Sequence, residues 1–183
     1  MNTPTRVFLY YLADPCLDLE TSSHILLNTF IVSHGIRIDT ILCLFSNDKT
    51  YVINGSELRH LYPQQNSLRG FAKAVFCKNK ELPGVYKNQN IILKDRIAIL
   101  YPFRKGLTIT DNPPGSYEEI IIILNNRRYF KKLLLRDIPK IPIYVPRNTS
   151  IETTITIINY VLDTWYGTAV RRKGKVIVYK ARQ

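Results

Sequence analysis

Four consecutive isoleucines followed by a leucine, at positions 120–124, constrain the fold of this chain more than any other feature of its sequence. A strand with one face in water alternates apolar and polar residues, whereas this run places no polar side chain on either face. Such a run is typical of a central strand in a parallel sheet that helices cover on both sides. The rest of the chain has to supply the neighbouring strands and helices.

Other apolar runs meet that requirement. Runs rich in β-branched and aromatic residues predict strands over 6–12, 40–45, 50–53, 97–101 and 141–145, with a brief strand over 90–93. Helical spacing of apolar residues predicts helices over 22–30, 67–76, 130–135 and 151–165. This alternation predicts an α/β fold with a mainly parallel sheet covered by helices.

Capping residues and a change of composition refine this division. We expect Ser22 or Ser23 to cap the first helix, and Thr149 with Glu152 to form a capping box for the last. Residues 1–166 are expected to form a single domain. The strongly basic residues 167–183 are expected to form a tail, either a β-hairpin or a mobile arm.

The charge balance and the cysteines indicate what kind of partner the protein binds and where in the cell it acts. The chain carries 26 Lys and Arg against 14 Asp and Glu, a net charge of +12 that is spread along its length. Such a balance favours a polyanionic partner, nucleic acid before membrane, although soluble proteins that bind neither can share it. Cys16, Cys43 and Cys77 are far apart and lack C-x-x-C spacing, so we expect reduced thiols in a cytoplasmic protein, with no signal peptide or membrane helix.

Several common catalytic signatures are absent from the sequence. It contains no G-x-G-x-x-G, P-loop, G-x-S-x-G or H-E-x-x-H motif, so nucleotide hydrolysis, dinucleotide binding and zinc proteolysis lack their usual residues. The histidines are not at metal-ligand spacing, and no metal site is predicted.

Polar residues instead gather around the strand pair at 40–53. SHGIRID (33–39) enters the first strand and NGSELR (54–59) leaves the second. Arg37 and Asp39 are two apart, so on an extended segment they point to the same side, where the residues alone favour a structural ion pair. Residues 125–129 follow the isoleucine run, at the position where parallel sheets bind ligands.

These segments resemble a known family. FIVSHGIRIDT, NGSELRHLYPQQNSLRGFAKAV, LPGVY and TITIINYVLD are similar, in this order, to segments of the archaeal tRNA pseudouridine-54 N1-methyltransferases (TrmY), members of the SPOUT class. The resemblance covers residues 22–163. It implies an α/β fold with a C-terminal trefoil knot, a homodimer, S-adenosylmethionine as cofactor and methylation of N1 of a pseudouridine in the T-loop of tRNA. The first segment and the basic tail lie outside it.

The resemblance also assigns residues to the cofactor. The family holds S-adenosylmethionine among three loops that follow three successive strands, here 100–105, 125–128 and 144–149. Leu100 and Pro146 match the family, whereas Asn125 stands in place of a glycine and Thr154 in place of a cysteine. Two arginines also replace an acidic loop. The predicted cofactor-binding residues are Leu100, Asn125, Tyr144, Pro146 and Thr154.

The implied reaction is a direct displacement. A flipped pseudouridine would present N1 to the methyl sulfonium, with Asp39 accepting the N1 proton or orienting the base and Arg37 placing the base or stabilising its negative charge. The predicted RNA contacts are His34, Glu57, Arg59, Arg69, Lys73, Arg171, Arg172 and Lys173. For the last three, a solvated arm is the alternative.

Two other functions stay open. The substrate could be ribosomal RNA, as in the related Nep-type SPOUT enzymes. Alternatively, the altered loops could belong to a SPOUT-like RNA-binding dimer that has lost the cofactor and catalysis. Cofactor affinity separates this last function from both enzymes, and substrate profiling separates the enzymes from each other.

Overall fold

The structure is a computed structural model that describes residues 3–33, 35–59, 61–89, 94–125 and 128–181. Its elements, in chain order, are β1 (Thr5–Tyr11), α1 (Leu19–Phe30), β2 (Ile31–Val32), β3 (Gly35–Arg37), β4 (Thr40–Phe45), β5 (Thr50–Asn54), α2 (Gln65–Ala72), the π-helical turn η1 (Lys73–Cys77), β6 (Val85–Lys87), β7 (Ile97–Phe103), β8 (Glu119–Ile123), α3 (Lys131–Leu134), β9 (Lys140–Tyr144), α4 (Ile151–Tyr166), β10 (Thr168–Arg172) and β11 (Lys175–Tyr179). The strand predicted over 90–93 lies outside the described residues.

The predicted mainly parallel sheet is confirmed. In the described chain, the large sheet has the order β6-β5-β4-β1-β8-β7-β9. Five neighbouring strands are parallel to one another: β4, β1, β8, β7 and β9. At the β4 edge, β5 pairs antiparallel with β4, and β6 pairs antiparallel with β5. The isoleucine strand β8 lies between β1 and β7 and is buried along its whole length, as expected of a central strand. A smaller sheet has the order β11-β10-β3-β2.

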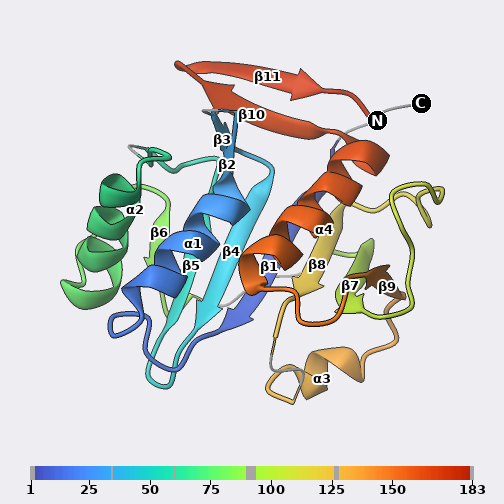
Figure 1. Ribbon diagram of the computed structural model, residues 1–183, viewed down its shortest axis with the longest axis horizontal. Coiled ribbons are helices and arrows are strands. Elements are labelled where there is room, and N and C mark those ends of the chain that lie inside the picture. The colour runs from blue at the N-terminus through green and yellow to red at the C-terminus, as the bar shows by residue number, and fades with distance from the viewer. Residues whose placement is uncertain (1–2, 34, 60, 90–93, 126–127, 182–183) are drawn as a thin grey trace.

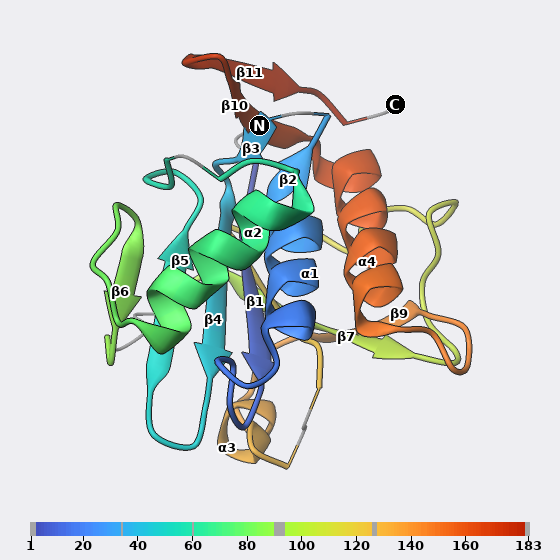
Figure 2. The ribbon, with the colours of Figure 1, turned by 60° about the vertical axis from the view of Figure 1, so that its left-hand side comes forward.

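Helices cover the two faces of the large sheet unequally. Figure 1 shows α1 and α4 side by side across one face, with α3 at the end where β1 and β4 finish, and Figure 2 shows α2 alongside α1. Phe8, Leu42 and Ile122 pack into the apolar cluster under the three longest helices, α1, α2 and α4. The opposite face, which includes Val7 and Ile121, packs with Phe130 and side chains of the α3 segment. Among the described helices, the short α3 thus covers the second face of the sheet.

Two predicted helix caps are wrong. α1 begins at Leu19, where the side chain of Asp18 accepts a hydrogen bond from the backbone N–H of Thr21 at 3.0 Å; Ser22 and Ser23 are buried within the helix. At α4 the cap is Ser150 in place of Thr149. In both cases apolar periodicity located the helix, but several neighbouring polar residues could supply its cap.

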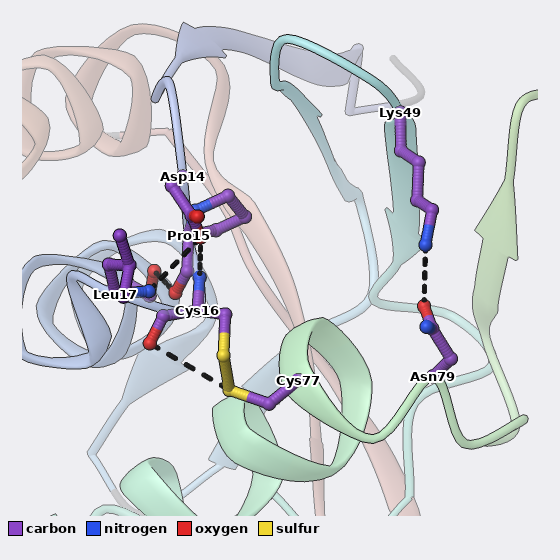
Figure 3. Close-up of a disulfide and its surroundings, with 8 residues drawn as sticks. Asp14, Pro15, Cys16, Leu17, Lys49, Cys77 and Asn79 are labelled. Atoms are coloured by element: carbon purple, nitrogen blue, oxygen red, sulfur yellow. Dashed lines mark hydrogen bonds between the residues drawn. A yellow bond between two sulfur atoms is a disulfide. The ribbon is translucent and has the colours of Figure 1, made fainter.

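The expectation of three reduced cysteines is also wrong. A disulfide joins Cys16, in the loop after β1, to Cys77 at the end of η1, while Cys43 is free and buried. Figure 3 shows this bond linking the loop to the helical turn. The two cysteines are 61 residues apart in sequence. Their proximity arises only when α2 packs on α1, which cysteine spacing does not reveal. Cysteine usage therefore no longer supports a cytoplasmic location.

The chain encloses β9 within an earlier loop. β9 pairs with β7 along one side, and on its other side Ile143 forms a bridge with Leu107 of the loop that follows β7. The middle of that loop lies against α4, where Trp165 Nε1 donates to the Asp111 carbonyl at 2.8 Å. The chain of β9 thus passes between two parts of the segment 97–107. A trefoil knot requires such a passage, and the knot itself stays a prediction.

The basic tail forms a hairpin over residues 168–179. β10 and β11 pair antiparallel, and β10 also pairs with β3, which attaches the hairpin to the amino-terminal half of the chain. Gly167, with φ of +77°, allows the turn from α4 into β10, because a Cβ there would lie 2.2 Å from the Tyr179 carbonyl oxygen. None of the helices within the described residues is long and apolar enough to span a membrane.

Candidate functional site

A buried charge network lies where β1 and β4 begin. Arg6, on β1, is fully buried and places Nη1 2.7 Å from Asp163 Oδ1 of α4. Its guanidinium also donates to Asn159 Oδ1 at 3.0 Å and to the Gly167 carbonyl at 2.6 Å, and lies 3.8 Å from Asp39 Oδ2. The network therefore fastens the C-terminal helix to the first strand of the sheet.

Arg37 and Asp39 belong to this network. They do point to the same side, where Thr168 bridges them: its hydroxyl accepts from Arg37 at 2.9 Å and donates to Asp39 at 3.2 Å. Arg37 itself forms a two-pronged pair with Asp163, at 2.7 and 2.8 Å, and Asp39 also accepts from the Ala169 N–H at 3.0 Å. The ion pair predicted between Arg37 and Asp39 is therefore wrong: Arg37 pairs with Asp163, and the arginine near Asp39 is Arg6.

Burial and charge oppose each other at these groups. Burial works to raise the pKa of Asp163, but hydrogen bonds and charge from Arg37 and Arg6 outweigh it, so its pKa lies below the ordinary value. Burial lowers the pKa of Arg6, and the nearby Asp39 carboxylate opposes that effect. The two arginines therefore hold the Asp163 carboxylate ionised.

A hollow of about 900 Å³ lies next to this network, between the GSELR loop and the LPGVY segment. Glu57, Arg59 and Arg171, all predicted RNA contacts, line it together with Tyr86. Glu57 accepts from Asn54 Nδ2 at 2.7 Å and from the Tyr86 hydroxyl, and this bond to Glu57 raises the pKa of Tyr86. The hollow therefore joins two segments that are distant in sequence.

The arginines of this hollow have different surroundings. Arg171 donates to the carbonyls of Gly55, Ser56 and Leu58, at 3.0, 2.9 and 2.6 Å, and so fixes the shape of the loop. Arg59 is exposed beside it. The other predicted RNA contacts are exposed basic side chains outside the hollow: Arg69 on α2, Lys73 on η1, and Arg172 and Lys173 at the hairpin turn. His34 lies outside the described residues.

The predicted cofactor residues lie at the opposite end of the sheet, where β7, β8 and β9 finish side by side. Asn125 follows β8, and its side-chain amide accepts from the Tyr11 N–H at 2.8 Å and donates to the Tyr11 carbonyl at 2.7 Å. Tyr144 ends β9 in register with Phe103. Pro146 follows it, whereas Leu100 and Thr154 are buried.

The two groups of residues are well separated within one chain. The backbone carbonyl of Asp39 accepts from the N–H of Arg6, near the start of β1, and Asn125 is bonded to Tyr11 at its end. Five residues of strand separate Arg6 from Tyr11, which corresponds to about 17 Å. The structure thus brings Arg37 and Asp39 close to the hollow beside the GSELR loop, and it brings the strand exits together, but it keeps these two groups of residues apart.

The sequence did not point to Arg6 or Asp163 as partners of the SHGIRID motif. Arg6 stands in an otherwise apolar strand, and Asp163 in the apolar helix segment TITIINYVLD. A charged residue within an apolar run is a signal for a buried ion pair. Its partner becomes known only from the fold. Among the described residues, no group of three or more His, Cys, Asp and Glu could hold a metal ion.

Comparisons with known proteins show which fold this chain shares. The chain matches no family model and no curated protein sequence. Among solved structures, it is similar to the crystal structure of Archaeoglobus fulgidus Nep1 bound to S-adenosylhomocysteine, with a TM-score of 0.54 and 9% sequence identity. The match covers 88% of this chain and 98% of that chain. The α/β architecture, with its mostly parallel sheet, is therefore the fold of Nep1 over nearly the whole molecule.

Proposed function

We propose that this protein is an S-adenosylmethionine-dependent RNA methyltransferase of the SPOUT class that acts on N1 of a pseudouridine, at position 54 in the T-loop of tRNA. The observation that carries this proposal is the fold, which over 88% of the chain matches a protein bound to S-adenosylhomocysteine, the product form of that cofactor. The quoted sequence segments and the net charge of +12 support RNA as the substrate.

The described strand exits are compatible with the cofactor. The Asn125 side chain turns toward β1, on the opposite side of β8 from β7, so it adds no atoms on the β7 side. The loop after β7 lies tightly on β9, because a Cβ at Gly106 would be 2.5 Å from the Pro142 carbonyl oxygen. Leu100, Tyr144, Pro146, Thr154 and the backbone of Asn125 would hold S-adenosylmethionine, which supplies an activated methyl group.

The amino-terminal end of the sheet is assigned to the RNA. Arg59, Arg172 and Lys173 provide exposed positive charge for phosphates at this end, and Arg69 and Lys73 add exposed charge on α2 and η1; such charge adds affinity without base selectivity. Arg171 acts through the loop whose carbonyls it binds, and Glu57 offers a carboxylate to the hollow. This end would therefore position the nucleic acid.

A role for Asp39 and Arg37 in the reaction requires a homodimer. Because about 17 Å separates the two ends of the sheet, Asp39 does not reach the strand exits of its own chain. In a dimer that sets the amino-terminal end of one protomer against the exits of its partner, Asp39 could accept the N1 proton. Three protein hydrogen bonds already orient its carboxylate for that task.

Two alternatives have support of their own. The first alternative is a ribosomal RNA substrate, as in the Nep-type SPOUT enzymes, and the structural likeness to Nep1 favours it. Asn125 in place of the family's glycine favours an RNA-binding dimer without catalysis. Both keep the basic surface, so RNA binding alone does not separate them from the main proposal.

A methyl-transfer assay tests the proposal. The protein is incubated with isotopically labelled S-adenosylmethionine and a tRNA that carries pseudouridine at position 54, and the digested nucleosides are analysed by mass. The control tRNA carries uridine there, because the N1 atom of uridine is bonded to ribose and has no proton to exchange. Label on the pseudouridine alone supports the proposal. If only a pseudouridine of ribosomal RNA is labelled, the substrate is ribosomal RNA in place of tRNA. If neither RNA is labelled, the protein is not an enzyme of this class.

A further inference from the structure

β11 is an edge strand of the small sheet. It pairs with β10, and in the sheet order β11-β10-β3-β2 it stands at one end. Figures 1 and 2 both show it on the side of β10 that faces away from the helices. All of its residues are exposed, and four of the five are apolar: Val176, Ile177, Val178 and Tyr179. Proteins seldom leave apolar residues uncovered along a sheet edge, because such an edge readily pairs with another chain.

The backbone of β11 directs hydrogen-bonding groups outward at this edge. Along an antiparallel pair, residues alternate between pointing their backbone groups at the partner strand and pointing them away. Ala169 of β10 points away from β11, because its N–H donates to Asp39 Oδ2 at 3.0 Å and its carbonyl accepts from the Ile38 N–H at 2.9 Å. Val178, which is in register with Ala169, therefore points its N–H and carbonyl away from β10, as does Val176. An approaching strand would find donors and acceptors at the spacing of a sheet.

The same two valines form an apolar face on β11. Val178 is 60% exposed and Val176 is 58% exposed, and both project from the face of the hairpin that carries Ala169. Ile177 projects from the opposite face, beside the buried Val170. β-Branched side chains on a strand pack well against those of a neighbouring strand, whereas the valines offer no ring on which a base could stack. This face therefore suits a polypeptide better than RNA.

The charge around β11 indicates the kind of polypeptide. Four exposed basic side chains surround the strand: Lys175, which begins it, Lys180, which follows it, and Arg172 and Lys173 at the hairpin turn. The sequence 164–181 contains no Asp or Glu. A second copy of β11 would bring the same positive charges into one interface, where they repel each other. A segment rich in Asp and Glu is attracted instead.

We propose that the edge of β11 binds an extended, acidic segment of another protein, which adds a further strand to the small sheet. The outward backbone groups of Val176 and Val178 set the register of that segment, and the two valine side chains pack against its apolar residues. Lys175 and Lys180 meet its carboxylates. The interaction goes beyond the proposed function, because it requires neither RNA nor S-adenosylmethionine.

The test is a titration, followed by fluorescence anisotropy, with a short labelled peptide in which Glu and Val alternate. The native chain should bind this peptide saturably, and it should not bind a peptide with Lys in place of Glu. Val178→Pro removes one outward N–H but no bond to β10, and it should weaken binding about fivefold or more. Leu135→Ala is the matched control, because Leu135 is 73% exposed among basic residues but lies outside the strands. The control should bind like the native chain.

Two further peptides test strand addition without changing the protein. N-methylation of every Glu nitrogen removes the donors on one edge of the peptide, and N-methylation of every Val nitrogen removes those on the other, so one peptide should lose binding and the other should keep it. Equal affinity for both overturns the inference, as does absence of binding to the unmodified peptide at millimolar concentration.

Other occupants of the edge give different results. If labelled oligouridine binds the native chain and Val178→Pro weakens that binding equally, the edge belongs to RNA and the inference is overturned. If light scattering finds a native dimer that Val178→Pro converts to a monomer, the occupant is a second copy, which also overturns it. Because the peptide titrations contain no RNA and no cofactor, their failure is distinct from failure of the proposed methyltransferase.

Discussion

Loss of the disulfide between Cys16 and Cys77 should lower the free energy of unfolding by about 4 kcal/mol. The bond closes a loop of 61 residues, and the entropy that such a closure removes from the unfolded chain grows with the logarithm of loop length. In the folded chain the bond joins the loop after β1 to the π-helical turn after α2. Reduction should therefore destabilise the protein without dismantling the helix-covered core.

Urea unfolding measures this effect. The native chain with and without reductant is compared with a Cys16→Ser/Cys77→Ser variant, and the reduced chain and the variant should lose the same amount. In the folded chain Cys43 does not interfere, because burial raises the pKa of its thiol to about 12 and leaves little thiolate to exchange. A fall of about 4 kcal/mol corresponds to roughly 10 °C in melting temperature for a chain of this size.

Two results would contradict this stabilisation by the disulfide. A loss below about 1 kcal/mol in both the reduced chain and the variant would mean that the loop closure does not constrain the unfolded state as the entropy relation requires. A variant that loses stability while the native chain is unaffected by reductant would mean that the two thiols are not joined in the native protein.

Three further predictions concern buried groups. Asp163→Ala leaves the buried Arg6 and Arg37 short of a partner and should lower the free energy of unfolding in urea by about 3–5 kcal/mol. In the native chain, the depressed pKa of Asp163 stabilises the fold, and this stability is lost as the pH falls through that pKa. Glu119→Gln should stabilise the protein at neutral pH, because burial raises the pKa of Glu119 and its Oε1 has no partner among the described residues, and the gain should fade as pH falls below the unfolded-state value. Gly55→Ala should lower the melting temperature, since its Cβ would lie 2.0 Å from the Arg37 carbonyl oxygen.

Each of these predictions has a contradicting result. An Asp163→Ala chain as stable as the native one would mean that water, not Asp163, satisfies the guanidinium ions. A Glu119→Gln variant less stable than the native chain at neutral pH would mean that the carboxylate has a partner in solution. An unchanged melting temperature for Gly55→Ala would mean that the loop after β5 shifts freely.

The parallel sheet was predictable from sequence because its strands are continuous apolar runs. The isoleucine strand β8 admits no other environment than a buried one, and the runs around it follow the same rule. The helix caps were less predictable, because Asp18, Ser22 and Ser23 can all act as caps and only the backbone decides among them.

Contacts across the fold were not predictable in the same way. Arg37 and Asp39 could be placed on one side of an extended segment, but the acid that Arg37 binds comes from α4, 126 residues later. The disulfide depends on the packing of α2 against α1. The strand exits are separated from the hollow beside the GSELR loop because the strands run from one to the other, and the positions of the site residues in the sequence do not reveal this direction.

Isothermal titration with S-adenosylmethionine shows whether this chain binds the cofactor, and Asn125→Gly is measured alongside the native chain. We expect the native chain to bind one molecule per chain with micromolar affinity. We expect no tighter binding by Asn125→Gly, because the Asn125 side chain is turned to Tyr11 and away from β7. Absence of heat from the folded native chain, with binding restored in the glycine variant, would contradict the proposed methyltransferase and leave an RNA-binding protein without its cofactor.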